Sequence, residues 1–197
     1  MNYLLRKQDG TITYPYSLSQ LRKDNPTTSF PEHLDAIAAE WNCFQVTSTE
    51  QPIYNPITHT LTEGTPVLQG DVYYQSWQVV PYTLEQAKQN KLAAIESEWQ
   101  QLEQIGWDCG NGHLGLSASD VALYSGAFAL AKEAAALGLP IPPIITKEDN
   151  QINFASIQEM TALLLQYGAA RSLMSADFAA RRRGVHEATT IEQLESI

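Results

Sequence analysis

The sequence predicts an α+β protein with a small N-terminal β-rich domain, a long connecting helix, and a C-terminal helical domain with two β-hairpins. Three observations support this fold class. Residues 1–82 are rich in Tyr, Thr, Pro and Trp and have poor helical patterning, which is typical of short strands and turns. Residues 83–106 have the start and stop signals of one helix, and residues 107–197 become Ala-rich and mainly helical. With 197 residues and 44% apolar composition, the chain can bury a core.

The first domain is expected to begin with a hairpin and a short helix. Residues 1–13 predict two short strands around Asp9-Gly10, because Asp-Gly readily adopts the backbone angles of a tight turn. Ser17 is the expected N-cap of a brief helix, and Gln20, three residues later, completes a capping box. Asn25-Pro26 ends this helix.

Two more strands are expected at 44–46 and 73–79, which carry β-branched and aromatic residues. The stretch between them holds residues that favour an extended, turn-rich path, namely Pro52, Pro56, Thr58, Gly64 and Pro66. The first domain is therefore expected to be a small sheet with long loops.

The connecting helix has the clearest signals in the chain. Thr83 and Gln86 form a capping box, residues 84–105 contain neither Gly nor Pro, and Gly106 is a natural stop. An apolar seam of heptad type runs along the helix through Leu92, Ile95, Trp99 and Leu102. Because the seam spans only about two heptads, packing on the chain's own domains is favoured over self-association.

Two hairpins are expected in the C-terminal domain. Asn111-Gly112, within residues 107–116, is the strongest short-range hairpin signal. Residues 144–146 and 152–154 flank a polar turn at 148–150 and predict the second hairpin.

Three helices complete this domain. Ser117 or Ser119 caps a helix from Asp120 to about Leu137. Ser156 and Glu159 open a helix that runs to about Arg183, with a candidate interruption at Gly168 and a stop at Gly184. Thr189 or Thr190 then caps a final helix at 191–197.

The charge of the chain argues against nucleic acid as a partner. The net charge is −10, and a duplex would be repelled by most of such a surface. No Lys or Arg occurs from Asp24 to Ala87, where the acidic residues are Glu32, Asp35, Glu40, Glu50, Glu63, Asp71 and Glu85. Solubility explains this stretch more simply than a basic partner does. The run Arg181-Arg182-Arg183 is interpreted as charge that complements a helix C-terminus.

No membrane segment is expected. No run approaches the roughly 18 apolar residues that a span needs, and the start of the chain lacks the features of a signal peptide. Cys43 and Cys109 lie far apart without a CxxC pattern, which indicates two free thiols in a reducing compartment. The chain is therefore expected to stay in the cytoplasm where it is made.

Residues that carry chemistry are few, and neither a metal nor a cofactor is expected. The four histidines, His33, His59, His113 and His186, stand apart from one another and form no ligand pair. A thiolate–imidazole pair of Cys109 and His113 is the formal rival, although the sequence names neither an orienting group nor an oxyanion site. Motifs such as GxSxG, the Walker loop and GxGxxG are absent from the sequence, which weakens an enzymatic function.

Aromatic residues are concentrated in the first domain and outnumber what a thin sheet buries easily. They are Tyr3, Tyr14, Tyr16, Phe30, Trp41, Phe44, Tyr54, Tyr73, Tyr74, Trp77 and Tyr82. Exposed aromatic side chains beside a Lys-free surface suit contact with another protein, and carbohydrate stacking is the main alternative. The candidate partner-binding residues are Tyr73, Tyr74, Trp77 and the seam Leu92, Ile95, Trp99 and Leu102.

Two blocks resemble proteins of tailed bacteriophages. Residues 16–31, followed by Trp77-Gln78-Val79 and the helix start at 83–87, resemble the opening of tail fibre or tail fibre assembly chaperone proteins. Residues 170–197 are similar to the end of an uncharacterised domain of phage tail fibre proteins. The resemblance implies a virion structural protein or helper at the distal tail or baseplate, and it transfers no catalytic residues.

A fibre helper fits the composition better than a fibre shaft, because a shaft would show repetitive β segments. The expected partner is a tail fibre protein, itself expected to be trimeric, with baseplate proteins as further candidates. The expected place is the host cytoplasm during assembly, with or without retention in the virion tail. Two alternatives stay open: an adhesin that binds the host receptor, and a hydrolase built on Cys109 and His113.

Overall fold

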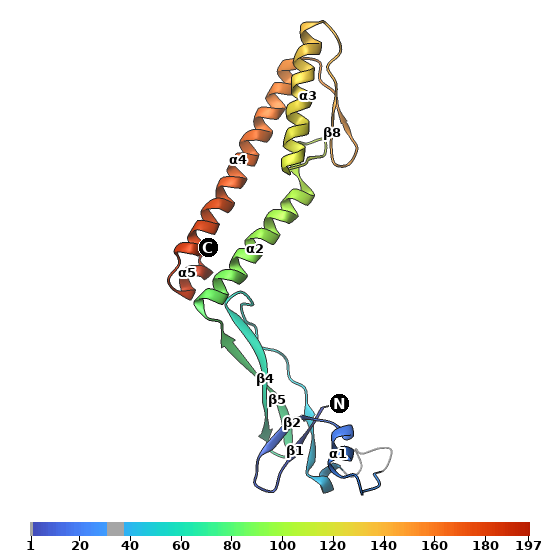
Figure 1. Cartoon of the computed structure of the whole chain (residues 1–197), viewed down its shortest axis with the longest axis vertical. Coiled ribbons are helices and arrows are strands. Elements are labelled where there is room, and N and C mark those ends of the chain that lie inside the picture. Colours follow the sequence, from blue (N-terminus) through green and yellow to red (C-terminus); the bar gives the residue numbers. More distant parts are fainter. Residues whose placement is uncertain (1, 31–37) are drawn as a thin grey trace. The chain divides into compact units, whose positions relative to one another are not determined.

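The chain is an α+β protein that divides into two compact units, residues 1–82 and 83–197. The computed structural model, shown in Figure 1, describes residues 2–30 and 38–197. Of the residues discussed above, Pro31, Glu32, His33 and Asp35 lie outside the described part.

The first unit is built on a curled five-stranded sheet of order β2-β1-β3-β5-β4. Its strands are β1 (Asn2–Arg6), β2 (Ile12–Tyr16), β3 (Cys43–Thr47), β4 (His59–Gln69) and β5 (Val72–Pro81). All neighbours are antiparallel except β3 and β5. The two edge strands approach each other, because the Tyr14 hydroxyl of β2 donates to the Glu63 carboxylate of β4.

Two small apolar clusters hold this sheet. One joins β1 and β2 to helix α1 (Leu18–Asp24) and the 3-10 turn η2 (Ala38–Trp41), and it consists of Tyr3, Tyr16, Leu21, Ala38 and Cys43. The other consists of Leu4, Val46 and Tyr73. Ser17 caps α1 as expected, but the Gln20 side chain donates to Asp24.

Strand β4 was not predicted, since the Pro and Gly residues in it indicated a turn-rich path. The structure accommodates Gly64 and Pro66 by a register irregularity between Gly64 and Val67 in the pairing with β5. A bulge interrupts the hydrogen bonds between an edge strand and its inner neighbour. Pro can stand there because its missing N–H then costs no hydrogen bond. The turn-rich prediction was therefore wrong for residues 59–69, whereas residues 48–58, which include Pro52, Pro56 and Thr58, form a loop and a turn as predicted.

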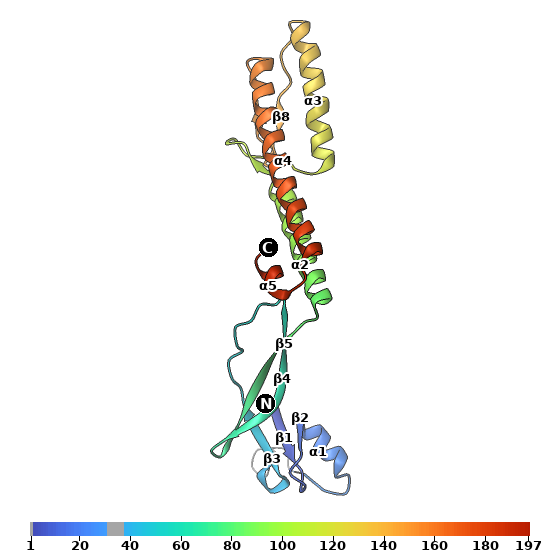
Figure 2. The same ribbon diagram turned by 90° about the vertical axis from the view of Figure 1, so that its left-hand side faces the viewer.

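The second unit consists of four helices and two short hairpins. The helices are α2 (Leu84–Ile105), α3 (Ala118–Ala136), α4 (Ile157–Glu187) and α5 (Ile191–Glu195). The hairpins are β6 (Trp107–Asp108) with β7 (His113–Leu114), and β8 (Ile144–Ile145) with β9 (Gln151–Ile152). Figures 1 and 2 both show α3 beside the first half of α4 and α2 beside its second half.

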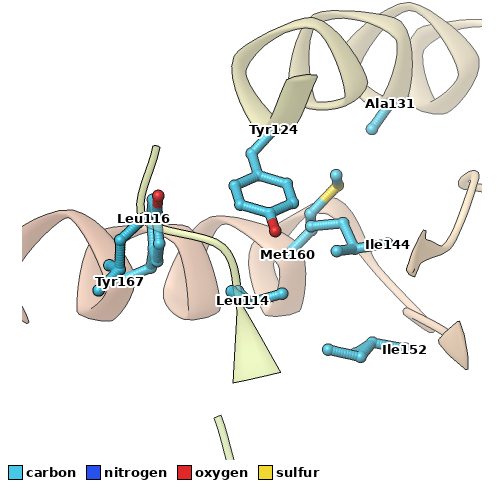
Figure 3. Packing of buried hydrophobic residues seen from close by; sticks show 8 residues of the cluster. All are labelled: Leu114, Leu116, Tyr124, Ala131, Ile144, Ile152, Met160 and Tyr167. Atoms are coloured by element: carbon cyan, nitrogen blue, oxygen red, sulfur yellow. The ribbon is translucent and has the colours of Figure 1, made fainter. Parts of the chain in front are cut away.

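The core of this unit lies where α3, α4 and both hairpins meet. Figure 3 shows its buried members, Leu114, Leu116, Tyr124, Ala131, Ile144, Ile152, Met160 and Tyr167. The rings of Tyr124 and Tyr167 meet edge to face at 5.3 Å. Both hydroxyl groups form hydrogen bonds with the backbone of Gly115. The Gly115 N–H donates to the Tyr124 oxygen, and the Tyr167 hydroxyl donates to the Gly115 carbonyl, both at 2.8 Å.

The predicted hairpins and most helix starts are confirmed, as are the ends of α1 at Asn25, of α2 at Gly106 and of α3 near Leu137, whereas the end of α4 differs. Ser117 and Thr190 are the N-caps of α3 and α5. Helix α4 continues through Gly168 and Gly184, so both breaks were predicted wrongly. A Cβ at Gly184 would lie 3.2 Å from Ile197 Cδ1, so this glycine makes room for the end of the chain.

Candidate functional site

The exposed apolar surface of the first unit is concentrated on the hairpin of β4 and β5. Five large apolar side chains there are 39–49% exposed, namely Val67, Leu68, Val72, Val79 and Val80. A sixth, Ile53, is fully exposed in the segment between β3 and β4. Strand alternation places Leu68 and Val79 on one face of the hairpin and Val67, Val72 and Val80 on the other, so exposed apolar side chains lie on both faces.

Beyond the sheet the hairpin carries apolar side chains on both faces, and Glu63 lies opposite Trp77 on one of them. Strand β3 pairs with β5 only at Tyr73 and Tyr74, so residues 59–64 and 76–81 form a two-stranded ribbon past that point. The alternation of strand side chains places Leu61, Trp77 and Val79 on one face, because Leu61 pairs with Val79 and Trp77 is two residues away. A two-stranded ribbon has little stability of its own, so a cover on this face would stabilise it.

The segment after β3 covers part of that face. Thr49 Oγ1 donates to the Gln75 carbonyl at 2.9 Å, and Trp77 Nε1 donates to the Thr49 carbonyl at 3.4 Å. Trp77 is consequently only partly exposed. Of the three aromatic residues predicted here, Tyr74 and Trp77 are partly exposed, whereas Tyr73 is buried in the cluster with Leu4.

The seam of α2 packs within the second unit, as favoured from the sequence. Ile95 is completely buried, and Leu102 packs against the core cluster. Trp99 meets Phe178 of α4 edge to face at 5.1 Å. Leu92 is partly buried. These residues form an internal helix contact, and Ile95, like Tyr73, offers no side-chain surface to a partner.

The arginine run strengthens the same helix contact. Arg181 Nη2 lies 2.7 Å from Glu98 Oε2 of α2, and this hydrogen bond lowers the pKa of Glu98. Arg182 Nη1 lies 4.0 Å from Glu96 Oε2. The interpretation as a helix terminus was wrong, because α4 continues to Glu187 beyond the run.

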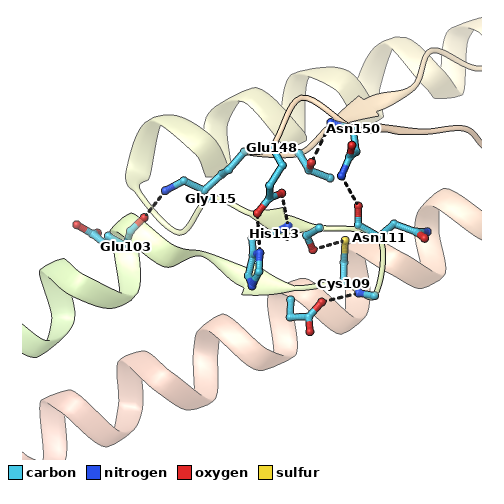
Figure 4. A network of polar contacts seen from close by, with 12 residues as sticks. Glu103, Cys109, Asn111, His113, Gly115, Glu148 and Asn150 are labelled. Carbon is cyan, nitrogen blue, oxygen red and sulfur yellow. Dashed lines mark hydrogen bonds and ion pairs between the residues drawn. The ribbon is translucent and has the colours of Figure 1, made fainter.

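The two short hairpins of the second unit are joined by a polar network, drawn in Figure 4. His113 N–H and His113 Nδ1 contact the two carboxylate oxygens of Glu148 at 2.8 and 2.6 Å. These bonds, the backbone one first, lower the pKa of Glu148 to about 2. Lys147 N–H donates to the His113 carbonyl, and a Cβ at Gly112 would lie 2.5 Å from the Glu148 carboxylate. The network therefore docks one hairpin on the other.

The same network separates Cys109 from His113. Asp108 and His113 are directly paired, so the next residue, Cys109, points to the opposite face of the hairpin. The Cys109 thiol donates to the Gly112 carbonyl at 3.0 Å (Figure 4). Glu148 is an orienting group that the sequence did not reveal, yet it holds His113 away from the thiol.

Residues 2–30 and 38–197 contain no group of three or more His, Cys, Asp or Glu side chains placed to hold a metal ion. Over the same residues, no helix has both the length and the apolar character that a membrane crossing requires. No protein-family model, curated protein or solved structure matches the chain.

The exposed valines of β5 were not predicted, because Val79 was assigned to a strand without any inference about its exposure, and Val72 and Val80 lie outside the predicted strand at 73–79. Their position in a ribbon beyond the sheet depends on where β3 ends, which the sequence does not mark. The contact between His113 and Glu148 joins residues 35 positions apart, and it also depends on how the hairpins dock.

Proposed function

We propose that this chain is a non-enzymatic structural protein of the bacteriophage tail or baseplate region, which binds the tail fibre as an assembly chaperone or as a capping or attachment subunit. The observation that carries the proposal is the apolar surface of the β4–β5 hairpin, where Val67, Leu68, Val72, Val79 and Val80 are exposed. The resemblance of residues 16–31 and of the C-terminal block to tail fibre-associated proteins supports the class of partner.

The surface suits a folded or folding protein chain. A partner strand or loop that covers Leu61, Trp77 and Val79 gains apolar burial of about 25 cal/mol per Å². It also completes a ribbon that is exposed on this face. The surrounding stretch from Asp24 to Ala87 lacks Lys and Arg, so basic groups at the rim of a fibre subunit meet no like charge there.

Direct binding to a host receptor is the second candidate function. Tyr74 and Trp77 are partly exposed on the same hairpin, and aromatic rings of this kind stack on sugars as well as on proteins. Binding of the isolated protein to host cells, without any fibre protein present, distinguishes this alternative.

Co-expression with the fibre protein encoded beside this chain tests the proposal. We expect the fibre protein to co-purify with the chain and to lose solubility without it. Val79→Asp places a charge among the exposed apolar side chains of the hairpin and should reduce co-purification at least about tenfold, since a buried unpaired charge costs several kcal/mol.

Gln8→Asp is the matched control, because Gln8 is exposed in the turn between β1 and β2 and lies outside the β4–β5 hairpin. It introduces the same charge and should leave co-purification unchanged. A fibre protein that folds, stays soluble and elutes separately from this chain would overturn the proposal. Equal losses with both variants would remove the β4–β5 hairpin as the binding surface.

A further inference from the structure

A groove lies along the contact between α3 and α4 in the second unit. It has two parts, with volumes of about 470 and 220 Å³, and both are lined by Val121, Tyr167 and Gly168. We call the two parts together the α3–α4 groove. The larger part alone reaches the size of a small-molecule site, which is commonly about 300–1,000 Å³.

The smaller part of the groove is apolar. Phe128 of α3 and Leu164 of α4 line it, and both are only half-buried against the core. The rings of Tyr124 and Tyr167 meet between the two helices (Figure 3), and their hydroxyls are already bonded to the backbone. The Ser125 hydroxyl donates to the backbone of its own helix. This part therefore offers aromatic and aliphatic surface to a ligand.

The larger part of the groove contains a guanidinium group without a counter-charge. Arg171 Nε donates to the Leu116 carbonyl at 3.1 Å, which fixes the side chain beside the groove. Within residues 83–197 no carboxylate oxygen lies within 4.0 Å of Arg171, whereas Arg181 and Arg182 of the same helix reach glutamates of α2. The two terminal nitrogens of Arg171 form no hydrogen bond inside this unit, so they are available to a ligand.

Two serine hydroxyls accompany this guanidinium group. Ser172 and Ser175 are exposed and line the same part of the groove, and Ser175 stands one helical turn after Arg171. Hydroxyl groups can donate to an anion that a guanidinium holds. Asp120, in the first turn of α3, does not line the groove, and it accepts from the N–H and the hydroxyl of Ser117. Arg171 is thus the one charged residue that lines the groove.

Gly168 stands where the two parts of the groove adjoin. It lies in the interior of α4, where Gly is less favourable for a helix than Ala. A Cβ at Gly168 would meet no atom within 4 Å, although the residue lines both parts of the groove. Packing of the core therefore does not require a glycine here. Its effect is to leave the groove open along its length, because a larger side chain would occupy it.

We propose that the α3–α4 groove binds a small organic monocarboxylate with an apolar body. The carboxylate accepts from the two terminal nitrogens of Arg171, since the two oxygens match the spacing of the guanidinium N–H groups. The apolar body lies over Gly168, between Phe128 and Leu164. This site is independent of the function proposed above, because it lies in the second unit and involves no residue of the β4–β5 hairpin.

Charge selects this class of ligand. The groove presents one cation and no anion, in a chain whose net charge of −10 repels anions elsewhere. A single carboxylate matches one guanidinium, whereas a dianion would bring a second, unmatched charge to an acidic protein.

The length of the groove suits a ring joined to a short aliphatic chain. Leu164 and Arg171 are seven residues apart on α4, which is about 10 Å along the helix axis. Because the groove is open, part of the ligand stays in water. We therefore expect a dissociation constant of around millimolar.

Titration of the full chain with phenylbutyrate, followed by NMR of the backbone amides, tests the proposal. We expect saturable shifts of the amide signals of Gly168, Arg171 and Ser172. Phenylbutyramide, which has the same body without the charge, should bind at least about tenfold more weakly. Butyrate, which has the charge without the ring, should also bind at least about tenfold more weakly.

Two variants locate the site. Arg171→Gln should weaken binding of phenylbutyrate at least about tenfold, whereas Arg183→Gln, the matched control, should not change it. Arg183 is exposed on the same helix and lines neither part of the groove. Gly168→Leu should block the groove without removing the bond from Arg171 to Leu116. Gly126→Leu is its control, because a side chain at this glycine of α3 also meets open space, outside the groove.

Losses of at least about tenfold in Arg171→Gln and Gly168→Leu, with both controls unchanged, would support the site. Amide signals that do not shift, or equal affinity for phenylbutyrate and its amide, would overturn it. So would an equal loss in Arg183→Gln and Arg171→Gln, or unchanged binding in a Gly168→Leu variant whose amide spectrum shows that it is folded.

Discussion

The β4–β5 hairpin and the two short hairpins of the second unit treat their apolar residues in opposite ways. The long hairpin pairs over nine registered positions and still leaves five large apolar side chains exposed. The short hairpins pair over two positions each, and their Leu114, Ile144 and Ile152 are buried in the core. Strand pairing alone therefore does not bury apolar surface. The short hairpins pack against α3 and α4, whereas the long hairpin keeps five large apolar side chains exposed.

The largest expected effect comes from truncating a buried residue of a short hairpin, compared with truncating an exposed residue of the long hairpin. Leu114→Ala should lower the free energy of unfolding by about 2–5 kcal/mol, because Leu114 is fully buried. Val79→Ala, on the exposed ribbon, should change it by less than about 0.5 kcal/mol. Urea unfolding followed by tryptophan fluorescence measures both. A comparable loss in Val79→Ala would mean that the ribbon contributes to the core of the first unit.

A smaller effect is expected from Tyr167→Phe. It removes the hydroxyl that donates to the Gly115 carbonyl and should cost about 1–3 kcal/mol, because that carbonyl is left buried without this donor. Tyr74→Phe, at a partly exposed position of the long hairpin, is the control and should have little effect.

The same tyrosine gives a pH dependence. Burial raises the pKa of Tyr167 to about 12, whereas in the unfolded chain the pKa is about 10. The stability linked to this group is therefore complete below pH 10 and is lost as the pH rises toward 12. Tyr167→Phe removes this ionisation. The free energy of unfolding should therefore fall less between neutral and alkaline pH in this variant than in the unchanged chain. An identical alkaline profile would contradict this.

The smallest effect concerns the docking of the short hairpins. Bonds from His113 lower the pKa of Glu148 to about 2, against 4.5 in the unfolded chain. The contact therefore contributes above pH 4.5 and is lost as the pH falls toward 2. The protection factor of the His113 amide hydrogen, which is its exchange rate measured by NMR relative to the intrinsic rate at the same pH, should fall as the pH is lowered over this range.

Glu148→Gln should make His113 exchange fast already at neutral pH, while Asp149→Asn in the same turn should leave the profile unchanged. High, pH-independent protection in both variants would show that backbone pairing alone docks the hairpins. That result would mean that the short hairpins, like the long one, are held by backbone pairing without help from this side-chain contact.

Signals confined to a few neighbouring residues were predicted well. The turns at Asp9-Gly10 and Asn111-Gly112 and the capping box of Thr83 and Gln86 are present as expected, because each depends on local backbone geometry. Strand β4 and the passage of α4 through Gly184 were not predicted, because neighbouring elements outweigh the local preference of Pro and Gly. Contacts such as Tyr14 with Glu63 depend on how the sheet curls.

For the candidate sites too, local spacing could be predicted from the sequence, whereas burial that depends on tertiary packing could not. The seam at Ile95 and Trp99 was recognised from its spacing, and its packing inside one unit was favoured correctly. Tyr73 was grouped with the surface aromatics, although the register of β3 and β5 buries it. The exposure of Leu123 and Leu130 on α3 was not predicted, because an Ala-rich helix shows no clear apolar face in its sequence and its outward side is known only once the core is placed.

The stretch from Asp24 to Ala87 without Lys or Arg has a practical consequence for experiments. Trypsin cannot cleave within it, so a large tryptic fragment that contains β4 and β5 would survive whether or not the first unit is folded. Amine-reactive labels and cross-linkers likewise cannot attach there. The chain can therefore be immobilised through its lysines while the β4–β5 hairpin stays chemically untouched.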